Sequence, residues 1–175
     1  EEYKAQVPFA SYGVNDLVFG TDTIRQSNLV RQRWLDNIYA GHFTHLDYHN
    51  KALSVVLGSS YTQYHGKHFG QVVWSDLAQA FGNKDFEYYN AKSQKNDLNS
   101  FLKVNYAWQR FKMDLDLQYR SIHYWSKGTD NELSVVKFDT NYRFFNPKVG
   151  ASYTINAKQY VYASYSIANR EPIRS

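Results

Sequence analysis

The strongest pattern in this chain is an alternation of apolar and polar residues. Between Phe111 and Arg120 every odd position is apolar or aromatic, and every even position is polar. A similar alternation runs through residues 53–62 and 102–106. Successive side chains of a β-strand point to opposite faces of the sheet, so a period of two predicts strands with one apolar and one polar face. One side of the sheet therefore requires hydrocarbon and the other requires water.

Short polar turns arrange this pattern into three hairpins. The predicted strand pairs are 37–48 with 52–64, 98–108 with 111–124, and 142–155 with 160–168. The segments 65–97 and 125–141 are predicted to be long loops, and residues 1–36 an irregular stretch with strand-like pieces at 3–9 and 29–35. Short turns on one side and long loops on the other are typical of outer-membrane barrels. The predicted fold class is all-β: an antiparallel up-and-down meander of about six main strands, part of a transmembrane β-barrel with long extracellular loops.

Composition supports this fold class. The chain of 175 residues has 16 Tyr, 11 Phe and 4 Trp, the residues that form girdles at the edges of membrane barrels. It has no Cys, which excludes disulfides and thiolate metal sites, and no apolar run long enough for a transmembrane helix. A net charge of +4 without any block of like charges gives no reason to expect nucleic acid as a partner. A soluble antiparallel sheet with a packed inner face is the alternative.

Several strings resemble the barrel of TonB-dependent outer-membrane receptors, especially those of Bacteroidetes. They are Arg33-Trp34-Leu35-Asp36-Asn37, the aromatic- and glycine-rich run from Tyr61 to Trp74, Tyr88-Tyr89, Phe144-Phe145-Asn146-Pro147-Lys148, Tyr162 to Ser166, and Asn169-Arg170-Glu171-Pro172. The resemblance implies that residues 1–175 form a single segment of a barrel of about 22 strands. By the same resemblance we expect this segment to be without the plug domain, the box that contacts TonB and the remaining strands, and its final residues, Ile173-Arg174-Ser175, do not match the terminal aromatic residue usual in the family. The resemblance further implies a location in the bacterial outer membrane.

The same resemblance implies a receptor that captures a scarce ligand, such as an iron chelate, a cobalamin or a glycan, and imports it with TonB-derived energy. Its partners would be outer-membrane lipid, the receptor's own plug domain, the TonB complex acting through that plug, and the small-molecule or glycan ligand. Flat aromatic faces in the loops can stack on such ligands. The candidate ligand-binding residues are Trp34, Tyr64, His65, His68, Phe69, Trp74, Tyr88, Tyr89, Tyr124 and Trp125. Packing within the loops and membrane girdles is the alternative role for each of them.

Polar residues opposite the apolar face form a second candidate set, which in a plugged barrel would face the lumen. They are Lys103, Asn105, Lys112, Asp114, Asp116, Gln118, Arg120 and Lys148, and the family string adds Arg170. Their mixed charges favour contact with the plug over a charge-selective pore. Solvation of the lumen, with salt bridges between neighbouring strands, is the alternative.

Catalytic and metal chemistry have little support in the sequence. His42 and His45 are three residues apart on a predicted strand and therefore point to opposite faces. His65 and His68, with Asp76 as a third ligand, are a weak metal hypothesis, so no metal site or cofactor is predicted. No nucleophile elbow, phosphate loop or carboxylate pair appears, and the chain is predicted not to be an enzyme. A soluble ligand- or carbohydrate-binding β-domain is the rival function, and a membrane-barrel enzyme such as a lipase is the least favoured.

Overall fold

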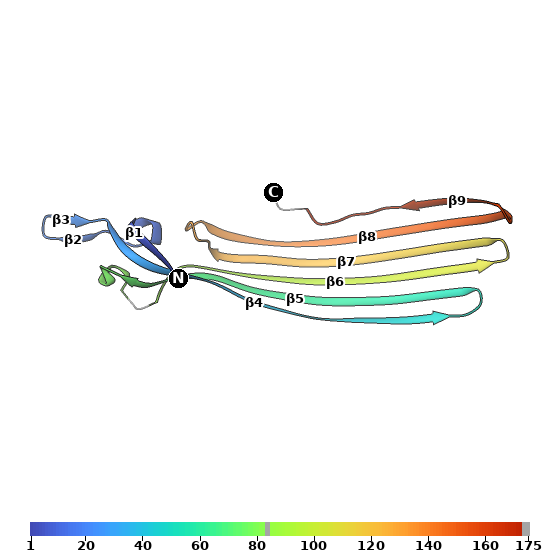
Figure 1. Cartoon of the computed structure of the whole chain (residues 1–175), viewed down its shortest axis with the longest axis horizontal. Coiled ribbons are helices and arrows are strands. Elements are labelled where there is room, and N and C mark those ends of the chain that lie inside the picture. The colour runs from blue at the N-terminus through green and yellow to red at the C-terminus, as the bar shows by residue number, and fades with distance from the viewer. Residues whose placement is uncertain (83–84, 173–175) are drawn as a thin grey trace. The chain divides into compact units, whose positions relative to one another are not determined.

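The computed structural model describes residues 1–82 and 85–172, and the chain end at 173–175 lies outside this range. Strands dominate it (Figure 1). They are β1 (Glu2–Pro8), β2 (Leu17–Phe19), β3 (Asp22–Ile24), β4 (Gln26–His49), β5 (Leu53–Ser75), β6 (Phe86–Trp108), β7 (Phe111–Thr129), β8 (Val135–Asn156) and β9 (Gln159–Ser166), with short 3-10 helices η1 (Phe9–Tyr12) and η2 (Ala78–Phe81). Within the described residues no helix is long and apolar enough to cross a membrane.

The sheet is an antiparallel meander, which confirms the predicted fold class. Seven strands follow one another in the order β1-β4-β5-β6-β7-β8-β9, and β2 and β3 form a separate hairpin. The predicted turns are present. Asn50 closes the first, because its Oδ1 accepts hydrogen bonds from the backbone N–H groups of Ala52 and Leu53 at 2.9 and 2.8 Å. Asn156 closes the third by accepting from the N–H of Lys158 at 2.9 Å. Asn side chains favour such turns because they mimic the backbone hydrogen bond.

The two predicted long loops are largely strand. β5 continues to Ser75 and β6 begins at Phe86, so only ten residues, 76–85, separate them. Likewise β7 ends at Thr129 and β8 begins at Val135. The prediction was wrong because it looked for alternation of apolar and polar residues. Residues 64–75 have polar or glycine residues on both faces, so pairing with neighbouring strands rather than burial of one face decides their structure.

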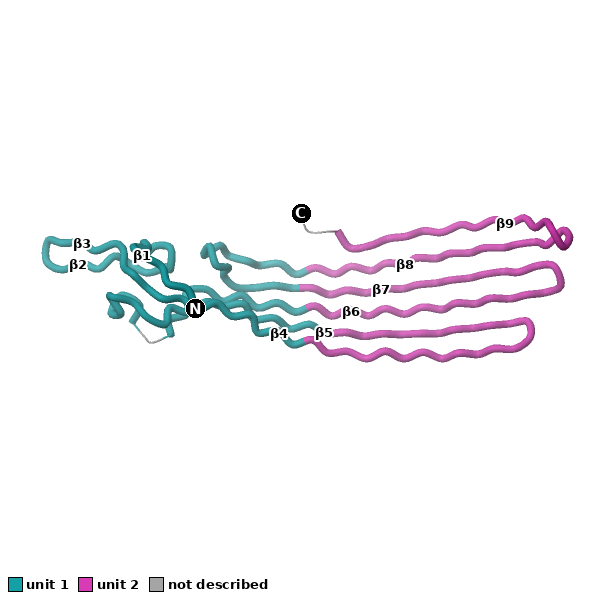
Figure 2. The backbone as a smooth tube through the Cα atoms, in the orientation of Figure 1, with its two compact units in different colours: residues 1–38, 64–94, 125–139 teal, residues 39–63, 95–124, 140–175 magenta. Residues whose placement is uncertain are grey.

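The chain forms two compact units, shown in different colours in Figure 2. Unit 1 comprises 1–38, 64–94 and 125–139, and its hydrophobic core is aromatic. Its buried residues are Phe9, Tyr12, Leu29, Val72, Phe81, Tyr88 and Tyr89. The rings of Phe9 and Phe81 pack edge to face with their centroids 6.0 Å apart, and the ring centroids of Tyr12 and Tyr88 are 4.6 Å apart. Unit 1 therefore has a core of its own.

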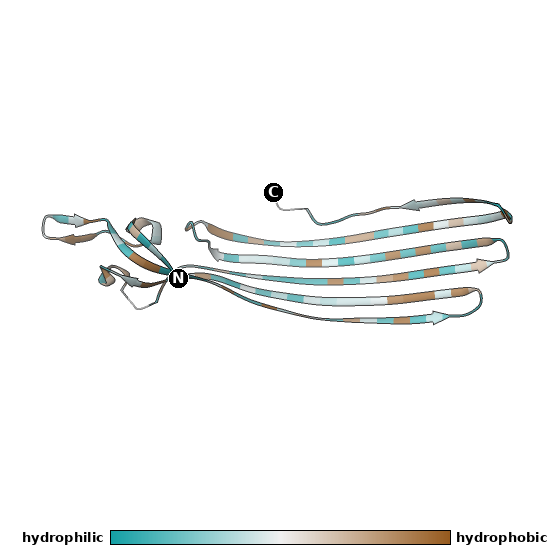
Figure 3. Ribbon diagram, viewed as in Figure 1, coloured by the Kyte–Doolittle hydropathy of each residue, from teal (hydrophilic) through white to brown (hydrophobic). Residues whose placement is uncertain are grey.

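Unit 2 comprises 39–63, 95–124 and 140–175, and it is an open sheet. Among its described residues Ile122 is the only buried hydrophobic side chain. Apolar and polar residues alternate along its strands (Figure 3). Large apolar side chains such as Leu57, Met113 and Val149 are about half exposed, at 49, 52 and 51%. A sheet with so little buried on either side requires a covering that the described residues of unit 2 do not supply.

Side-chain contacts establish which residues of unit 2 share a face. Lys103 on β6 pairs with Asp116 on β7 at 4.0 Å, and Gln118 donates to Asn99 at 3.1 Å. Asn146 on β8 reaches Gln118 at 3.4 Å. We call this side the polar face. By the alternation of a strand, the other side, the apolar face, carries Leu53, Val55, Leu57, Leu102, Val104, Met113, Leu115, Leu117 and Val149.

Candidate functional site

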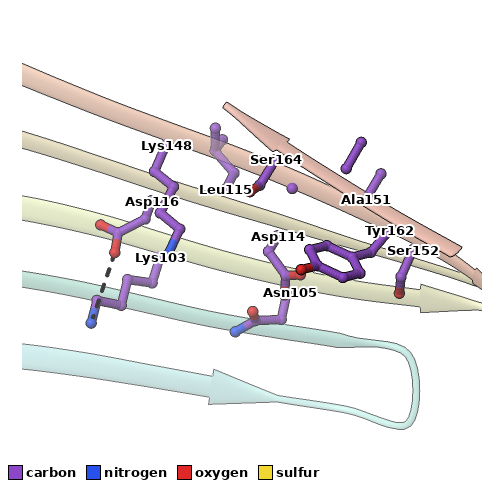
Figure 4. Close-up of a pocket in the computed structure, with 12 residues that line it drawn as sticks. Lys103, Asn105, Asp114, Leu115, Asp116, Lys148, Ala151, Ser152, Tyr162 and Ser164 are labelled. Carbon is purple, nitrogen blue, oxygen red and sulfur yellow. Dashed lines mark ion pairs between the residues drawn. The ribbon is translucent and has the colours of Figure 1, made fainter. Parts of the chain in front are cut away.

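A groove on the polar face of unit 2 gathers many of the predicted polar residues (Figure 4). Its volume is about 380 Å³. Five of the nine predicted lumen-facing residues line it: Lys103, Asn105, Asp114, Asp116 and Lys148. Sequence reasoning missed Tyr162, Ser152 and Ser164, which β8 and β9 contribute to the same groove. Strand alternation in β9 could have found Tyr162 and Ser164, because Tyr162 pairs with Ser152 and Ser164 pairs with Gly150 across β8.

The groove is chemically mixed. Two lysines and two aspartates balance each other, and Figure 4 shows the Lys103–Asp116 ion pair and the Tyr162 ring among the lining residues. Hydroxyl and amide groups add donors and acceptors of neutral charge. Such a surface suits a polar partner with groups of both signs rather than one kind of ion. Lys112 lies outside this groove and lines a neighbouring depression of about 400 Å³ with Thr154 and Asn156.

A network of ion pairs lies on the polar face of β6 and β7. Arg120 donates from Nε and Nη2 to the two oxygens of Asp97, at 3.0 and 2.6 Å. Glu171, from the segment after β9, accepts from Lys95 Nζ at 2.9 and 3.1 Å and lies 3.5 Å from Arg120 Nη2. We call these four residues, Lys95, Asp97, Arg120 and Glu171, the ionic clamp.

A pair of asparagines reinforces the clamp. The backbone N–H of Asn169 donates to Asn146 Oδ1 at 2.6 Å, and Asn146 Nδ2 donates to the Asn169 carbonyl at 3.1 Å. Residues 169–171 are thereby tied to β8, β7 and β6. The predicted Arg120 and Gln118 take part in polar contacts on this face, whereas Arg170 is exposed and lies outside the clamp. Glu171 follows Arg170 in the string Asn169-Arg170-Glu171-Pro172, which resembles the family. That string was the sequence signal that could have pointed to Glu171.

All ten predicted ligand-binding residues lie on strands rather than in loops. Trp34 on β4 stacks with Phe69 on β5, with centroids 6.2 Å apart and an interplanar angle of 12°, and Lys67 Nζ lies 4.0 Å from the centre of the Phe69 ring. Trp34 is 43% exposed. Tyr64 donates from its hydroxyl to Asn37 Oδ1 at 2.9 Å. This part of unit 1 therefore offers two stacked rings with a cation on one side of the strands, whereas the Tyr64–Asn37 hydrogen bond lies on the other side by alternation.

Trp74 belongs to a different surface. It is 50% exposed and lines a depression of about 440 Å³ with Val72, Phe81 and Gln79. The depression places an exposed indole beside apolar side chains and an amide. An apolar ring with a few polar neighbours is the usual make-up of a small-molecule site.

The remaining candidates are less accessible. Tyr88 and Tyr89 are buried in the core of unit 1, where their rings close over Gly70. Burial raises the pKa of both phenols above the ordinary value, although nearby arginines oppose the shift. These two tyrosines support the surface but do not present a face to a ligand. Tyr124 and Trp125 on β7 are half-buried.

The histidines do not form a metal centre. His65 and His68 are both exposed, but they are three residues apart within β5, and a strand turns such residues to opposite faces. Asp76 Oδ2 accepts a hydrogen bond from Asn28 at 2.7 Å. No group of three or more His, Cys, Asp or Glu residues with metal-binding geometry occurs in the described part of the chain. His42 and His45 have different neighbours, Tyr61 and Asp47 respectively, as their spacing predicts.

Comparison with known proteins identifies the family. No curated protein matches the chain. The family model described as TonB dependent receptor-like, beta-barrel, matches residues 2–173, nearly the whole sequence. The members of this family are transporters of the bacterial outer membrane rather than enzymes, and their general partners are a plug domain, TonB and a ligand. The open meander, its two unlike faces and this match show that the chain belongs to the TonB-dependent receptor β-barrel family.

Proposed function

We propose that this chain is a single segment of the barrel wall of a receptor that captures a scarce ligand outside the cell and imports it with energy supplied through TonB. The observation that carries the proposal is the contrast between the two faces of unit 2. The apolar face suits lipid, and the polar face, with its groove and ionic clamp, suits the plug inside a barrel. The apolar face is left open by the rest of the unit, and residues 169–171 contact only part of the polar face.

The exposed apolar face argues against the alternative of a soluble ligand- or carbohydrate-binding domain. Soluble monomers rarely expose a large contiguous apolar patch. Here side chains from β5, β6, β7 and β8 contribute to one continuous face, and Met113 and Val149 are each about half exposed. Lipid removes this surface from water without any need for a second layer of protein.

Ligand capture is assigned to the accessible aromatic residues of unit 1, which lie on two surfaces. Trp34 and Phe69 provide stacked rings on one surface and Trp74 an exposed ring on the other, and His65 and His68 provide exposed polar side chains nearby in sequence. Flat rings of this kind stack on sugars and on the ring systems of iron chelates or cobalamin. Tyr88 and Tyr89 are buried in the hydrophobic core of the same unit.

Uptake by the full-length receptor tests this function. Cells that depend on the receptor are supplied with an iron chelate, a cobalamin or a glycan, with and without a functional TonB complex. We expect uptake of one of these ligand classes, lost without TonB. The variant W34A/F69A should weaken binding of that ligand at unchanged receptor level, whereas W108A, which removes an exposed Trp at the turn end of β6, should not. Uptake that does not depend on TonB, or equal binding by both variants, contradicts the proposal.

A further inference from the structure

Pro147 ends the pairing of β8 with β9. The last pair that the two strands form is Lys148 with Ser166. The next pair would be Pro147 with Ile167, and the backbone N–H of Ile167 does donate to the Pro147 carbonyl at 3.0 Å. Proline has no N–H group with which to return this hydrogen bond, so the ladder of paired residues stops here. The sequence itself therefore sets the point at which the chain leaves the sheet.

Two asparagines direct the departing chain over the polar face. The side chain of Asn146 binds both backbone groups of Asn169, as a neighbouring strand would, and Asn169 Nδ2 donates to the Phe145 carbonyl at 3.2 Å. Asn146 lies on the polar face, because its Nδ2 also reaches Gln118 Oε1 at 3.4 Å. The chain beyond β9 therefore continues over the polar face and not over the apolar one.

Glu171 carries this segment across two further strands. Its carboxylate accepts from Lys95 Nζ on β6 at 2.9 and 3.1 Å and lies 3.5 Å from Arg120 Nη2 on β7. Residues 167–172 thus run from the end of β9 over β8 and β7 to β6, all within unit 2. We call residues 167–172 the strap.

The strap is attached weakly at its far end. Five of its six residues are exposed, and only Glu171 is partly buried. The side chains of Lys95 and Glu171 are 29 and 33% exposed, and ion pairs with this exposure contribute little to stability because water screens them. Arg120 keeps its two hydrogen bonds to Asp97 whether or not Glu171 is in place. Release of Glu171 therefore leaves the sheet and its least exposed ion pair intact, and few contacts hold the strap down.

We propose that the strap is a displaceable bar across the polar face, and that Glu171 must leave Lys95 and Arg120 before a ligand can pass along this face. The inference rests on the proposed function, because it takes the polar face to line the inside of the barrel. A segment on that side of the wall occupies space through which the ligand has to move. The strap is thus a two-state element, held closed by the Asn146–Asn169 hydrogen bonds and by the Glu171 ion pairs.

The test locks the strap reversibly in the full-length receptor. The variant K95C/E171C is treated with a short bis-methanethiosulfonate cross-linker, which ties the strap to β6, and N146C/N169C ties it to β8 and replaces the first pair should that one not assemble. The control S59C/S100C joins β5 to β6 away from the strap, where the two hydroxyl oxygens are 3.0 Å apart. Labelled ferric chelate, cobalamin and a linear glycan are the probes, and the one that wild-type receptor takes up is used. Cross-link yield, receptor level, probe bound at the cell surface and TonB-dependent uptake are measured before and after reduction.

We expect the cross-linked strap variant to bind the probe at the surface as before, to take it up no faster than cells without TonB, and to recover uptake on reduction, whereas the cross-linked control transports normally. Uptake at the wild-type rate with the strap locked would overturn the proposal, as would equal loss of uptake in the control. Absence of cross-linking would show that the strap does not dock, and failure of both strap variants to assemble would show that it is a fixed part of the wall; either result overturns the proposal. Wild-type receptor that takes up none of the probes refutes the proposed function instead, because cross-link yield reports docking of the strap independently of uptake.

Discussion

Replacement of Arg120 by Met should be the most destabilising single change in the ionic clamp. The Arg120 side chain makes two hydrogen bonds to Asp97, at 3.0 and 2.6 Å, and a longer contact of 3.5 Å to Glu171. Asp97 is the least exposed member, with 17% of its side chain accessible. Loss of Arg120 therefore leaves a largely buried carboxylate without its cation.

The magnitude follows from this geometry. Hydrogen bonds to charged groups are worth about 1.5–3 kcal/mol, and an unpaired, partly buried charge adds a desolvation cost. We expect R120M to lower the free energy of unfolding by about 2–3 kcal/mol. Among the residues that the structure describes, Lys95 forms an ion pair with Glu171 alone, and their side chains are 29 and 33% exposed, so K95M should cost about 0.5–1 kcal/mol. The variant R120K keeps the charge but loses the bidentate hydrogen bonds to Asp97. Its loss in free energy of unfolding should lie between those of K95M and R120M.

Urea unfolding of the full-length receptor in lipid vesicles measures these differences. The double variant R120M/K95M should cost more than the sum of the two single variants if Glu171 is a shared partner, because each single variant leaves Glu171 one cation and the double variant leaves it none. A K95M variant as destabilised as R120M, or an R120K variant as destabilised as R120M, would refute the importance of the bidentate Arg120–Asp97 pair.

Three further predictions concern the faces of the sheet, a close contact and pH. L115R should impair assembly of the receptor in the membrane by about 2–4 kcal/mol, while K112L, on the polar face, should be milder; equal tolerance in a membrane-folding assay would count against the assigned faces. G58V should weaken folding by about 1–3 kcal/mol, because a Cβ there would lie 2.3 Å from the Phe101 ring, and F101A should restore part of the loss in the double variant. Hydrogen bonds from Lys4 and Arg31 lower the pKa of Glu2 from 4.5 to about 2, so the stabilisation of β1 is complete above pH 4.5 and is lost as the pH falls towards 2. Hydrogen exchange of the β1 amides should show this loss in wild type and not in E2Q.

The sequence allowed a good prediction of unit 2 and a poor one of unit 1. Parts of the strands of unit 2 have apolar and polar residues in alternation, strictly so between Phe111 and Arg120, and the pairing and faces of these parts follow from that pattern. In unit 1 the extended strands carry polar and apolar residues on both faces, so residues such as His65 and Lys67 show no regular alternation and were predicted to lie in a loop. The predicted ligand-binding residues Tyr88 and Tyr89 are buried in the structure, and this burial had no local signal because it depends on a core that includes Tyr12, which is distant in sequence.

The sequence likewise allowed prediction of the groove residues but not of the ionic clamp. Alternation placed Lys103, Asn105 and Asp116 on one face, and the structure gathers them in one groove. The clamp could not be predicted in this way, because Glu171 lies 76 residues from Lys95 and 51 from Arg120 in the chain, beyond the end of the last strand. Its contacts depend on how the chain leaves β9, and this is not encoded in a local pattern.

Accessibility of single cysteines on β7 in the assembled receptor tests the central claim most directly. The chain has no Cys of its own, so each introduced residue is unique within it. Met113, Leu115 and Leu117 are replaced one at a time by Cys, as are Asp114, Asp116 and Gln118, and whole cells and isolated outer membranes are treated with lipid-soluble and membrane-impermeant thiol reagents. The account predicts that the first three react only with the lipid-soluble reagent, and that the second three react with the water-soluble reagent once the lumen is accessible. Reaction of both sets with the water-soluble reagent, or of neither with the lipid-soluble one, would show that the apolar face does not contact the membrane and would contradict the account.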